Sequence, residues 1–456
     1  MEKVTMEKIT NVCKQYGFIF QGSEIYGGLA NTWDYGPLGV EVKNNVKKAW
    51  WQKFIQESQN SYGVDAAILM APRVWEASGH VDSFSDPLID CKECKTRHRA
   101  DHLVESFDKT IIADKMTDQE MISFIQEHKV KCPNCGKSNF TDVREFNLMF
   151  KTERGVTADN KSTIYLRPET AQGEFVNFLN IQRTMRAKVP FGIGQIGKAF
   201  RNEITPGNFT FRTIEFEQME HQWFCKPGTD SAFYQDYKTK EMDFFINLGI
   251  NKDKLRYHDH DKLAHYAKEA CDVEYEFDFG FGEIGGTHNR TDYDLKRHEE
   301  FSGKPMIYLD PETNDKYTPY VIESSIGCDR ATLAFLCDAY HEETLEDGTT
   351  REVMSFHPFL APYKVAVLPL VKKHHSIKAL EIFKDLAKEF MCTYDETGNI
   401  GKRYRRQDIA GTPFCITVDD ETLNNETVTI RDRDTMEQIT LPTWEVAAYV
   451  KEKMKF

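Results

Sequence analysis

Cationic, aromatic and acidic side chains in the middle of the chain could together bind a nucleotide. They surround the turn signal Pro206-Gly207-Asn208, which separates two β-like arms and predicts an antiparallel hairpin with a long loop. Because successive residues of a strand face opposite sides, we expect Arg201 and Glu203 to share one face of the first arm. The residues expected to share a face of the second arm are Arg212, Phe216 and Glu220.

Such a strip has the chemistry that ATP requires. A guanidinium grips phosphate oxygens bidentately and neutralises charge that develops at phosphorus, and a flat ring stacks on adenine. The spacing alone is equally compatible with a surface hairpin that carries salt bridges. Both interpretations stay open on the residue pattern.

Two cysteine pairs are the second chemical feature. Cys91 and Cys94 form one Cys-x-x-Cys pair, and Cys132 and Cys135 form the other. Four thiolates at such spacings suit tetrahedral Zn²⁺ in a structural site. A redox-active pair is the alternative, and the gap between the pairs is longer than in compact zinc ribbons. No thioredoxin-like βαβ pattern surrounds either pair, which favours zinc.

The elements that position these residues belong to a chain of 456 residues, for which roughly three domains are expected. Hydrophobic residues make up 40%, enough for globular cores. No apolar run suits a membrane span, and the N-terminus has no signal-like segment. Eleven cysteines without such a signal favour a reducing, cytoplasmic location. The net charge of −14, taken alone, favours a small-molecule enzyme over a nucleic-acid binder, although a local basic patch is compatible with it.

Changes in composition divide the chain. Residues 1–90 predict a helix, a glycine-rich stretch and, after a break at Gly36–Gly39, a second helix over 40–58. Residues 91–149 carry the cysteine pairs, and 341–360 predict a linker. Residues 361–456 predict a small α/β domain. The other predicted elements are strands at 162–166, 189–196, 211–216, 365–371, 414–418 and 427–431, a helix capped by Ser376 and ending near Phe390, and a helix at 442–453.

The hairpin resembles part of a known enzyme class. Arg-x-Glu, a loop and then Arg-x-x-x-Phe-x-x-x-Glu is similar to motif 2 of the class II aminoacyl-tRNA synthetases. Gly327-Cys328-Asp329-Arg330 is similar to their motif 3, and Trp33–Trp51 around Pro37 resembles motif 1. The resemblance implies an α+β catalytic domain whose antiparallel sheet is flanked by helices. This domain would be split into residues 1–90 and 150–340 by a small four-cysteine insertion at 91–149.

The same resemblance implies roles for individual residues. Arg201 would contact the α-phosphate, Phe216 would stack on adenine, and Glu203 would read its amino group. Arg201, Arg212 and Arg330 would form the catalytic set, the last two holding the outer phosphates. Glu283 lies where the class contacts ATP and its Mg²⁺, with an ordinary loop carboxylate as the alternative. The implied ATP-binding residues are Arg201, Asn202, Glu203, Phe211, Arg212, Phe216, Glu283, Ile284, Gly327 and Arg330.

Segments 20–28, 33–41, 167–173 and 323–327 resemble the glycyl members of the class. The discriminating feature is Glu169-Thr170-Ala171-Gln172, because threonyl and prolyl enzymes carry another tetrapeptide after Arg-Pro. Three carboxylates would surround the substrate ammonium, and Thr287-His288 departs from the apolar residues usual in the family. Every competing amino acid is larger than glycine, so no editing domain is expected. The implied glycine-binding residues are Arg99, Glu169, Phe216, Glu217, Gln218, Glu220, Glu323 and Ser325.

Residues 361–456 resemble the anticodon-binding domain of several class II enzymes, above all at 361–369. Lys402–Arg406 mixes cations with an aromatic ring, which suits RNA contact, although a solvated helix face is the alternative. The implied partners are tRNA(Gly), glycine, ATP and a second copy in a homodimer, with no membrane. In the implied reaction, the glycine carboxylate attacks the α-phosphorus of ATP, and the tRNA 3′-hydroxyl then attacks glycyl-adenylate.

The sequence leaves two alternative functions. A non-catalytic RNA- or polymerase-accessory relative would have lost the phosphate-gripping arginines, which are present here. A synthetase for threonine or proline is the other alternative.

Overall fold

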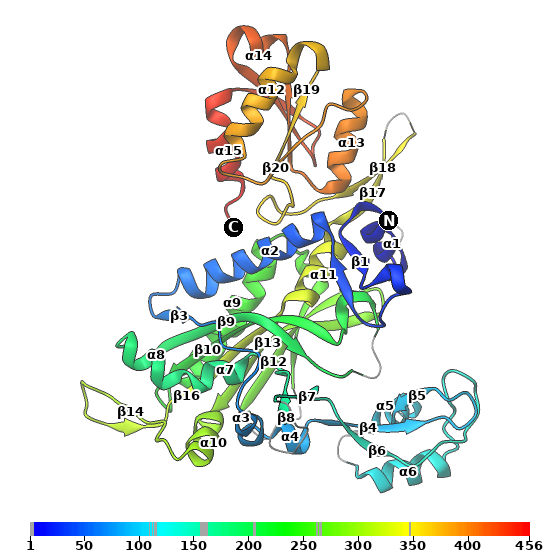
Figure 1. The fold of residues 1–456 in the computed structure, drawn as a ribbon, viewed down its shortest axis with the longest axis vertical. Coiled ribbons are helices and arrows are strands. Elements are labelled where there is room, and N and C mark those ends of the chain that lie inside the picture. The colour runs from blue at the N-terminus through cyan, green and yellow to red at the C-terminus, as the bar shows by residue number, and fades with distance from the viewer. Residues whose placement is uncertain are drawn as a thin grey trace.

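A mixed sheet occupies the centre of the computed structural model (Figure 1), which describes residues 4–456 except 109, 112, 114–115, 156–162, 204–206, 261–262, 264–266 and 346–347. Its neighbouring strands are antiparallel, apart from the parallel pair β3–β9 at one edge. In spatial order, the seven strands seen in the described residues are β11 (Leu255–Asp259), β12 (Glu269–Phe277), β13 (Gly280–Thr291), β16 (Tyr320–Gly327), β10 (Glu215–Cys225), β9 (Phe191–Phe200) and β3 (Ser61–Gly63).

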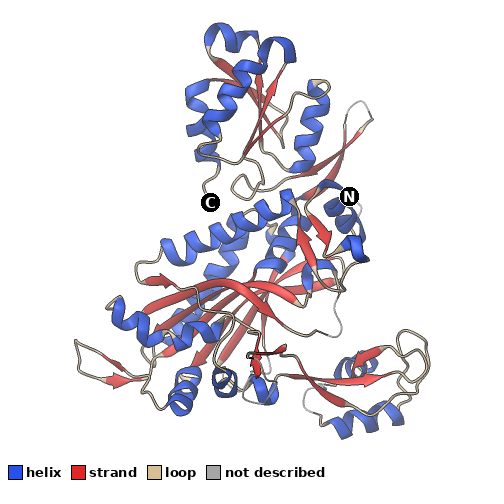
Figure 2. Cartoon of the chain, viewed as in Figure 1, coloured by secondary structure: helices blue, strands red, loops and turns tan. Residues whose placement is uncertain are grey.

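Helices cover both faces of this sheet (Figure 2). The helices on one face are α2 (Pro37–Trp51), α9 (Asp230–Asn247) and α11 (Cys328–Ala339). Those on the other face are α7 (Ala171–Val176), α8 (Phe178–Thr184) and α10 (Tyr293–Ser302), which contacts α3 (Pro72–Ala77). In β10, Met219 packs in the first layer and Phe224 in the second, so the even-numbered residues of β10 face α7.

The N-terminal segment leads into the first helical layer through α1 (Met6–Tyr16), β1 (Ile19–Gln21) and β2 (Trp33–Tyr35). Helix α2 begins at Pro37, earlier than the predicted residue 40, because proline is favoured in the first turn of a helix. Gly39 does not break the helix. A Cβ atom there would lie 1.8 Å from the Phe18 carbonyl oxygen, so only glycine permits this close approach. The helix continues into a π-turn at Gln52–Gln56.

The cysteine-bearing insertion folds around a core of its own, which includes Ile89, Leu103 and Ile125. Its sheet has the order β5 (Arg97–Arg99), β4 (Ser85–Asp90), β6 (Arg144–Asn147), with α5 (Ala100–Phe107) and α6 (Asp118–Glu127) beside it. The structural unit therefore begins at Ser85, whereas the sequence predicts a start at residue 91. It extends away from the central sheet at the lower right of Figure 1. Short elements adjoin it: α4 (His80–Ser83), β7 (Lys151–Glu153) and β8 (Thr163–Tyr165).

Residues 341–360, predicted as a linker, instead include most of a β-hairpin. Its strands are β17 (Tyr340–Thr344) and β18 (Thr350–Met354), and Val353, Met354 and Leu360 are fully buried. A small hairpin of β14 (Tyr308–Leu309) and β15 (Lys316–Tyr317) precedes β16. Among the described residues, no helix has both the length and the apolar character needed to cross a membrane.

The C-terminal domain is built on a sheet of order β20-β19-β21-β22-β23, with β19 parallel to both of its neighbours. The strands are β19 (Val365–Pro369), β20 (Cys392–Tyr394), β21 (Phe414–Val418), β22 (Thr427–Asp432) and β23 (Gln438–Pro442). The helices are α12 (Lys372–Leu386), α13 (Ile400–Ala410), α14 (Asp420–Asn425) and α15 (Val446–Lys453). Helix α12 begins before Ser376, whose hydroxyl donates to the Lys372 carbonyl within the helix instead of capping it.

Candidate active site

The predicted hairpin is present, but its loop holds more of the charged residues than the sequence indicates. Strands β9 and β10 pair from Phe200–Glu215 to Phe191–Phe224. Arg201 and Glu203 follow β9, and Arg212 precedes β10, so the strand-alternation argument for Arg212 is wrong. Asn208 and Phe209 have positive φ angles of 56° and 59° and start a short 3-10 turn at Phe209–Phe211. Within the predicted turn, Pro206 lies outside the described residues.

An open cleft lies beside this hairpin. It brings together all of the expected ATP-binding residues except Asn202. The Arg201 guanidinium carbon lies 5.4 Å from the centre of the Phe216 ring, and that of Arg330 lies 4.3 Å from the centre of Phe211. Arg330 also donates to Glu283 Oε2 at 2.9 Å. The cleft therefore places two cations and two rings around one space.

Ile284 is an extra residue in β13. Val273 lies opposite Gly285 and Glu274 opposite Glu283, so the residue between them has no direct partner on β12. Such bulges re-aim side chains beside functional sites. Here the bulge accompanies an exposed Glu283 and a fully buried Ile284, both of which line the cleft.

Asp329, in the first turn of α11, anchors the floor of the cleft. Its carboxylate accepts hydrogen bonds from Lys43 Nζ at 2.6 Å, Tyr35 Oη at 2.7 Å and the Glu217 backbone N–H at 2.6 Å. Burial opposes ionisation of Asp329, but Lys43 holds its pKa below the usual value. Sequence reasoning missed Asp329, Lys43 and Tyr35 as site residues. The sequence signal for Asp329 was its place in the first turn of a predicted helix, where the helix dipole stabilises a negative charge.

Three carboxylates lie at the α7 side of the sheet. Glu220 of β10 lies directly opposite Ser325 of β16, whose hydroxyl donates to it at 2.9 Å. Gln218 Nε2 also donates to Glu220 at 2.9 Å, and the Thr170 hydroxyl donates to its other oxygen. The hydrogen-bond donors around Glu220 are therefore two hydroxyls and one amide, all neutral.

The other two carboxylates lie beside basic side chains, an arginine in one case and a histidine in the other. Arg290 Nη1 lies 3.2 Å from Glu323 Oε1, and the same arginine pairs with Asp294. His80 Nε2 lies 3.3 Å from Glu169 Oε2. Burial alone would raise the pKa of both acids, but Arg290 lowers that of Glu323 to about 2, and His80 and Arg290 lower that of Glu169.

Glu220 differs in its electrostatics. Burial, followed by the charges of Glu323 and Glu169, raises its pKa to about 7. The donors that surround it are hydroxyls and an amide, so a bound cation would balance its ionised form. We therefore expect an ammonium ligand to stabilise the ionised form of Glu220.

Glu174 of α7 lies near this group and was missed by the sequence reasoning. It is fully buried, and neither carboxylate oxygen has a hydrogen-bond partner among the described residues. Burial and the charges of Glu220 and Glu323 hold its pKa well above the usual value. No sequence pattern singled it out, since an acid in the first turn of a helix is commonly a surface residue.

Thr287 and His288, the predicted departure, face opposite sides of the sheet. His288 lies opposite Glu323, with its Nδ1 3.1 Å from Glu323 Oε1, and Glu323 raises the His288 pKa against the effect of burial. Thr287 lies opposite Ser324, whose hydroxyl donates to Glu241 of α9 on the far face. Only His288 therefore belongs to the carboxylate group.

Two expected glycine-binding residues lie apart from this group. Glu217 points to the opposite face of β10, with its carboxylate 3.2 Å from Lys43 and 3.4 Å from Lys47. Arg99 lies on the insertion and pairs with Asp86 at 2.9 Å and Asp101 at 2.5 Å. The remaining expected residues of the set, Phe216 and Gln218, line the cleft with Ser325.

The four predicted metal ligands converge at one point in the insertion. The sulfur atoms of Cys91, Cys94, Cys132 and Cys135 all lie within 4.8 Å of one another. The Cys91–Cys135 and Cys94–Cys132 sulfur distances are 3.6 and 3.7 Å. A tetrahedral ion with bonds of about 2.3 Å to sulfur requires sulfur separations of about 3.8 Å. The arrangement therefore fits Zn²⁺.

The cationic run Lys402–Arg406 lies on α13 and makes mainly internal contacts. Arg403 is buried and donates to the carbonyls of Pro369, Glu396 and Gly398. The Tyr404 hydroxyl is 2.6 Å from that of Thr417, and Arg406 pairs with Asp395. This run therefore stabilises the C-terminal domain, which weakens its interpretation as an RNA-contacting patch.

Comparisons with known proteins extend over the whole chain. The family described as tRNA synthetase class II core domain (G, H, P, S and T) matches residues 150–340, and that described as anticodon binding domain matches residues 364–453. A glycine–tRNA ligase of Geobacillus kaustophilus is 60% identical over 99% of this chain and 100% of its own length. That of Clostridium acetobutylicum is 59% identical over the full length of both. That of Bacillus cereus is 57% identical over 99% of this chain and 100% of its own.

Proposed function

The chain belongs to the glycine–tRNA ligases of the class II aminoacyl-tRNA synthetases, and from this premise we propose that it charges tRNA(Gly) through a glycyl-adenylate made from glycine and ATP. The observation that carries the residue-level proposal is an unequal set of three carboxylates, of which Glu220 and Glu323 are buried and Glu169 is partly exposed. Glu323 has Arg290 beside it and Glu169 has His80, whereas the donors around Glu220 are hydroxyls and an amide.

ATP would lie along the cleft between the hairpin and α11. Phe216 would stack on adenine, and Glu203 would accept from its amino group. Arg201 would bind the α-phosphate, while Arg212 and Arg330 hold the outer phosphates. Asn202 and Phe211 complete the hairpin side, and Ile284 and Gly327 the sheet side. Mg²⁺ bound with the nucleotide would supply further positive charge, and Glu283 would help to hold it.

Glycine would bind with its ammonium at Glu220, Glu169 and Glu323 and with Ser325 beside it. Its carboxylate would then point toward Arg201 and attack the α-phosphorus, with pyrophosphate leaving. No protein nucleophile is required, so catalysis rests on positioning and on charge stabilisation by the arginines. The 3′-hydroxyl of the tRNA terminal adenosine would next attack the activated carbonyl, and AMP would leave.

Selection of glycine would follow from close packing around the ammonium site. Gln218 and Glu220 are buried on β10, with Thr170 packed against Glu220. A side chain on the substrate would have to displace these groups, and no smaller amino acid exists to be rejected. Such steric exclusion needs no second, hydrolytic site. Arg99 and Glu217 would act from outside the ammonium pocket, Arg99 from the insertion and Glu217 through Lys43.

The four cysteines would hold a structural Zn²⁺ that fixes the insertion. Both pairs turn through the same knuckle, in which the Lys95 N–H donates to the Cys91 carbonyl and the Gly136 N–H to the Cys132 carbonyl. We place the catalytic domain at residues 1–84 and 150–340, on either side of the insertion that begins at Ser85, and the anticodon-binding domain at 361–456. A cytoplasmic location, where tRNA is charged, accompanies this role.

A homodimer is supported by an exposed apolar group between β1 and β2. Ile25 is 89% exposed, Tyr26 86% and Leu29 57%. Such clustered exposure of large apolar side chains marks an interaction surface. A second copy of the chain would cover them.

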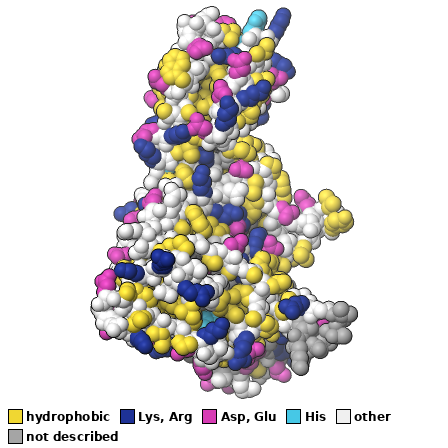
Figure 3. Space-filling view, turned by 60° about the vertical axis from the view of Figure 1, so that its left-hand side comes forward, with side chains coloured by type: hydrophobic (Ala, Val, Ile, Leu, Met, Phe, Trp, Pro, Cys, Tyr) yellow, Lys and Arg dark blue, Asp and Glu magenta, His cyan; other side chains and the backbone are white. Residues whose placement is uncertain are grey.

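Recognition of tRNA by a chain with net charge −14 requires local basic surface. On the face drawn in Figure 3, Lys and Arg side chains are interspersed with acidic ones over both domains, so that face is not uniformly acidic.

The test is glycine-dependent exchange of pyrophosphate into ATP, measured with a panel of all amino acids, followed by charging of tRNA(Gly). Exchange with glycine alone supports the proposal, and exchange with threonine or proline would replace it. A protein that binds tRNA but exchanges with no amino acid would be the accessory alternative. The retained Arg201, Arg212 and Arg330 argue against that alternative.

A further inference from the structure

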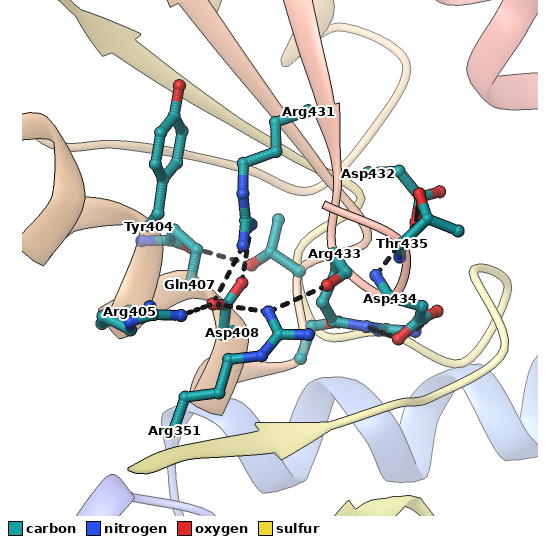
Figure 4. Close-up of polar contacts among 12 residues, drawn as sticks. Arg351, Tyr404, Arg405, Gln407, Asp408, Arg431, Asp432, Arg433, Asp434 and Thr435 are labelled. Carbon is teal, nitrogen blue, oxygen red and sulfur yellow. Dashed lines mark hydrogen bonds and ion pairs between the residues drawn. The ribbon is translucent and has the colours of Figure 1, made fainter. Parts of the chain in front are cut away.

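A buried ionic cluster joins the C-terminal domain to the β17–β18 hairpin (Figure 4). Its centre is Asp408 of α13, which is fully buried, and Arg351 of β18 is 2% exposed. Arg351 Nη1 donates to Asp408 Oδ2 at 3.1 Å and to the Arg433 carbonyl at 3.1 Å. Arg431 of β22 donates to both Asp408 oxygens, at 2.8 and 3.2 Å. Arg405 of α13 also donates to Asp408 Oδ2, at 3.4 Å, so this carboxylate accepts from two guanidiniums of its own domain and from one outside it.

Further contacts beside this cluster join the C-terminal domain to the residues that follow the β17–β18 hairpin. Arg433 donates from Nη1 to the Gly411 carbonyl and from Nη2 to the Phe356 carbonyl, both at 2.8 Å. Gly411 has φ +82°, and a Cβ atom there would lie 2.5 Å from the Phe356 ring. The Ser355 hydroxyl donates to Asp434 at 2.6 Å. The domain is thus held by directional bonds and close packing, and not by the chain connection alone.

The β17–β18 hairpin follows directly after helix α11, which carries Arg330 of the nucleotide cleft. Helix α11 begins beside Arg330 and ends at Ala339, and β17 starts at the next residue, Tyr340. A helix of this length spans about 18 Å and transmits position as a rigid rod. Arg351 also pairs with Glu343, which lies opposite it on β17. An unbroken structured path therefore runs from the phosphate-binding arginine to Asp408.

We infer that Arg351 is a positioning residue, whose bond to Asp408 sets the orientation of the C-terminal domain relative to the nucleotide cleft and thereby governs tRNA charging but not glycine activation. The inference rests on the proposed function. A tRNA that contacts both domains binds well only if their separation and orientation match its two contact points. Glycine and ATP contact one domain, so their reaction does not depend on this orientation.

The experiment compares two reactions in full-length Arg351→Met. Methionine keeps an unbranched apolar stem, and Arg431 still neutralises Asp408, so the variant should fold. We expect glycine-dependent pyrophosphate exchange to stay within about twofold of the parent, while kcat/KM for tRNA(Gly) falls about 10-fold or more, mainly through KM, within the 5–150-fold range of inter-site coupling. Arg351→Lys, which keeps a cation against Asp408, should recover part of the loss.

Glu343→Gln is the matched control, because it changes the partner of Arg351 that is partly exposed and leaves the Asp408 bond intact. It should charge tRNA like the parent. Unchanged charging by folded Arg351→Met would overturn the inference, as would a parallel loss of exchange and charging. If Arg351→Met does not fold, the comparison is made with Arg351→Lys, and charging equal to the parent's with an altered domain orientation in solution scattering would refute the role. A parent that fails glycine exchange refutes the proposed function instead.

Discussion

Replacing Glu220 with glutamine tests the ammonium pocket at a carboxylate whose hydrogen-bond donors are all neutral. The amide has nearly the same shape, and the Ser325 hydroxyl and Gln218 amide can still donate to its oxygen, as they do to Glu220 Oε1 at 2.9 Å. The Thr170 hydroxyl can rotate to accept from the new amide nitrogen. The substitution therefore removes a negative charge with little change in packing.

The expected loss follows from the charge removed. A hydrogen bond to a charged group contributes ~1.5–3 kcal/mol, which corresponds to an increase of roughly 10- to 150-fold in KM for glycine. The KM for ATP should change little, because the nucleotide contacts other side chains. Glu323 and Glu169 remain charged in the variant, so binding is weakened and not abolished.

The pKa of Glu220 adds a pH signature. Because burial and the neighbouring acids raise this pKa from 4.5 to about 7, the carboxyl is protonated below neutrality and cannot pair with an ammonium. KM for glycine should therefore rise about tenfold for each pH unit below about 7 in the parent and flatten in Glu220→Gln. The raised pKa also means that protonation stabilises the fold, so this contribution to stability is lost as pH rises from about 4.5 to about 7.

The assay is pyrophosphate exchange at varied glycine between pH 6 and 8.5. Glu215→Gln is the control, since Glu215 lies on the same strand but is exposed and pairs with Lys198. An unchanged glycine KM in Glu220→Gln, or the same pH profile as the parent, would refute the role given to Glu220.

Three further outcomes are expected. Arg201→Ala should cut glycine-dependent exchange roughly 100- to 1000-fold, as loss of one preorganised donor of ~2.7–4 kcal/mol does, and a near-normal rate would remove Arg201 from its role. Reduced, chelator-free protein should contain about one Zn²⁺ per chain by metal analysis and lose it in Cys135→Ser, whereas clearly substoichiometric zinc in the parent would contradict the site. The protein should sediment at twice its chain mass of 52.9 kDa, and the double change Ile25→Ser, Tyr26→Ser should shift it toward the monomer; an unaltered dimer in that variant would place the interface elsewhere.

Local patterns predicted the hairpin well because its pairing is short in range. The period-two rule placed Phe216 and Glu220 on one face of β10, as the structure has them. It failed for Arg212 because the loop contains a 3-10 turn at Phe209–Phe211 and β10 begins only at Glu215, after Arg212. Periodicity holds only while the backbone stays extended, and the sequence signal does not mark where it stops.

Contacts between segments that are far apart in the sequence could not be predicted from local patterns. The fixing of Asp329 depends on Lys43 and Tyr35, which precede it by most of the chain. The segment 341–360 is polar in composition and is typical of a linker, yet Arg351 is buried there because Asp408 receives it. A buried ion pair cannot be deduced from one of its members, since each looks like a surface charge alone.

The Lys43–Asp329 bond has a consequence for synthesis of the protein on the ribosome. Its two residues are 286 positions apart, so at ~5–20 residues per second roughly 15–60 s separate their emergence. Throughout that interval α2 lacks the α11 surface that finally packs against it. A holding chaperone should therefore associate with the nascent chain until the segment beyond residue 339 has left the exit tunnel.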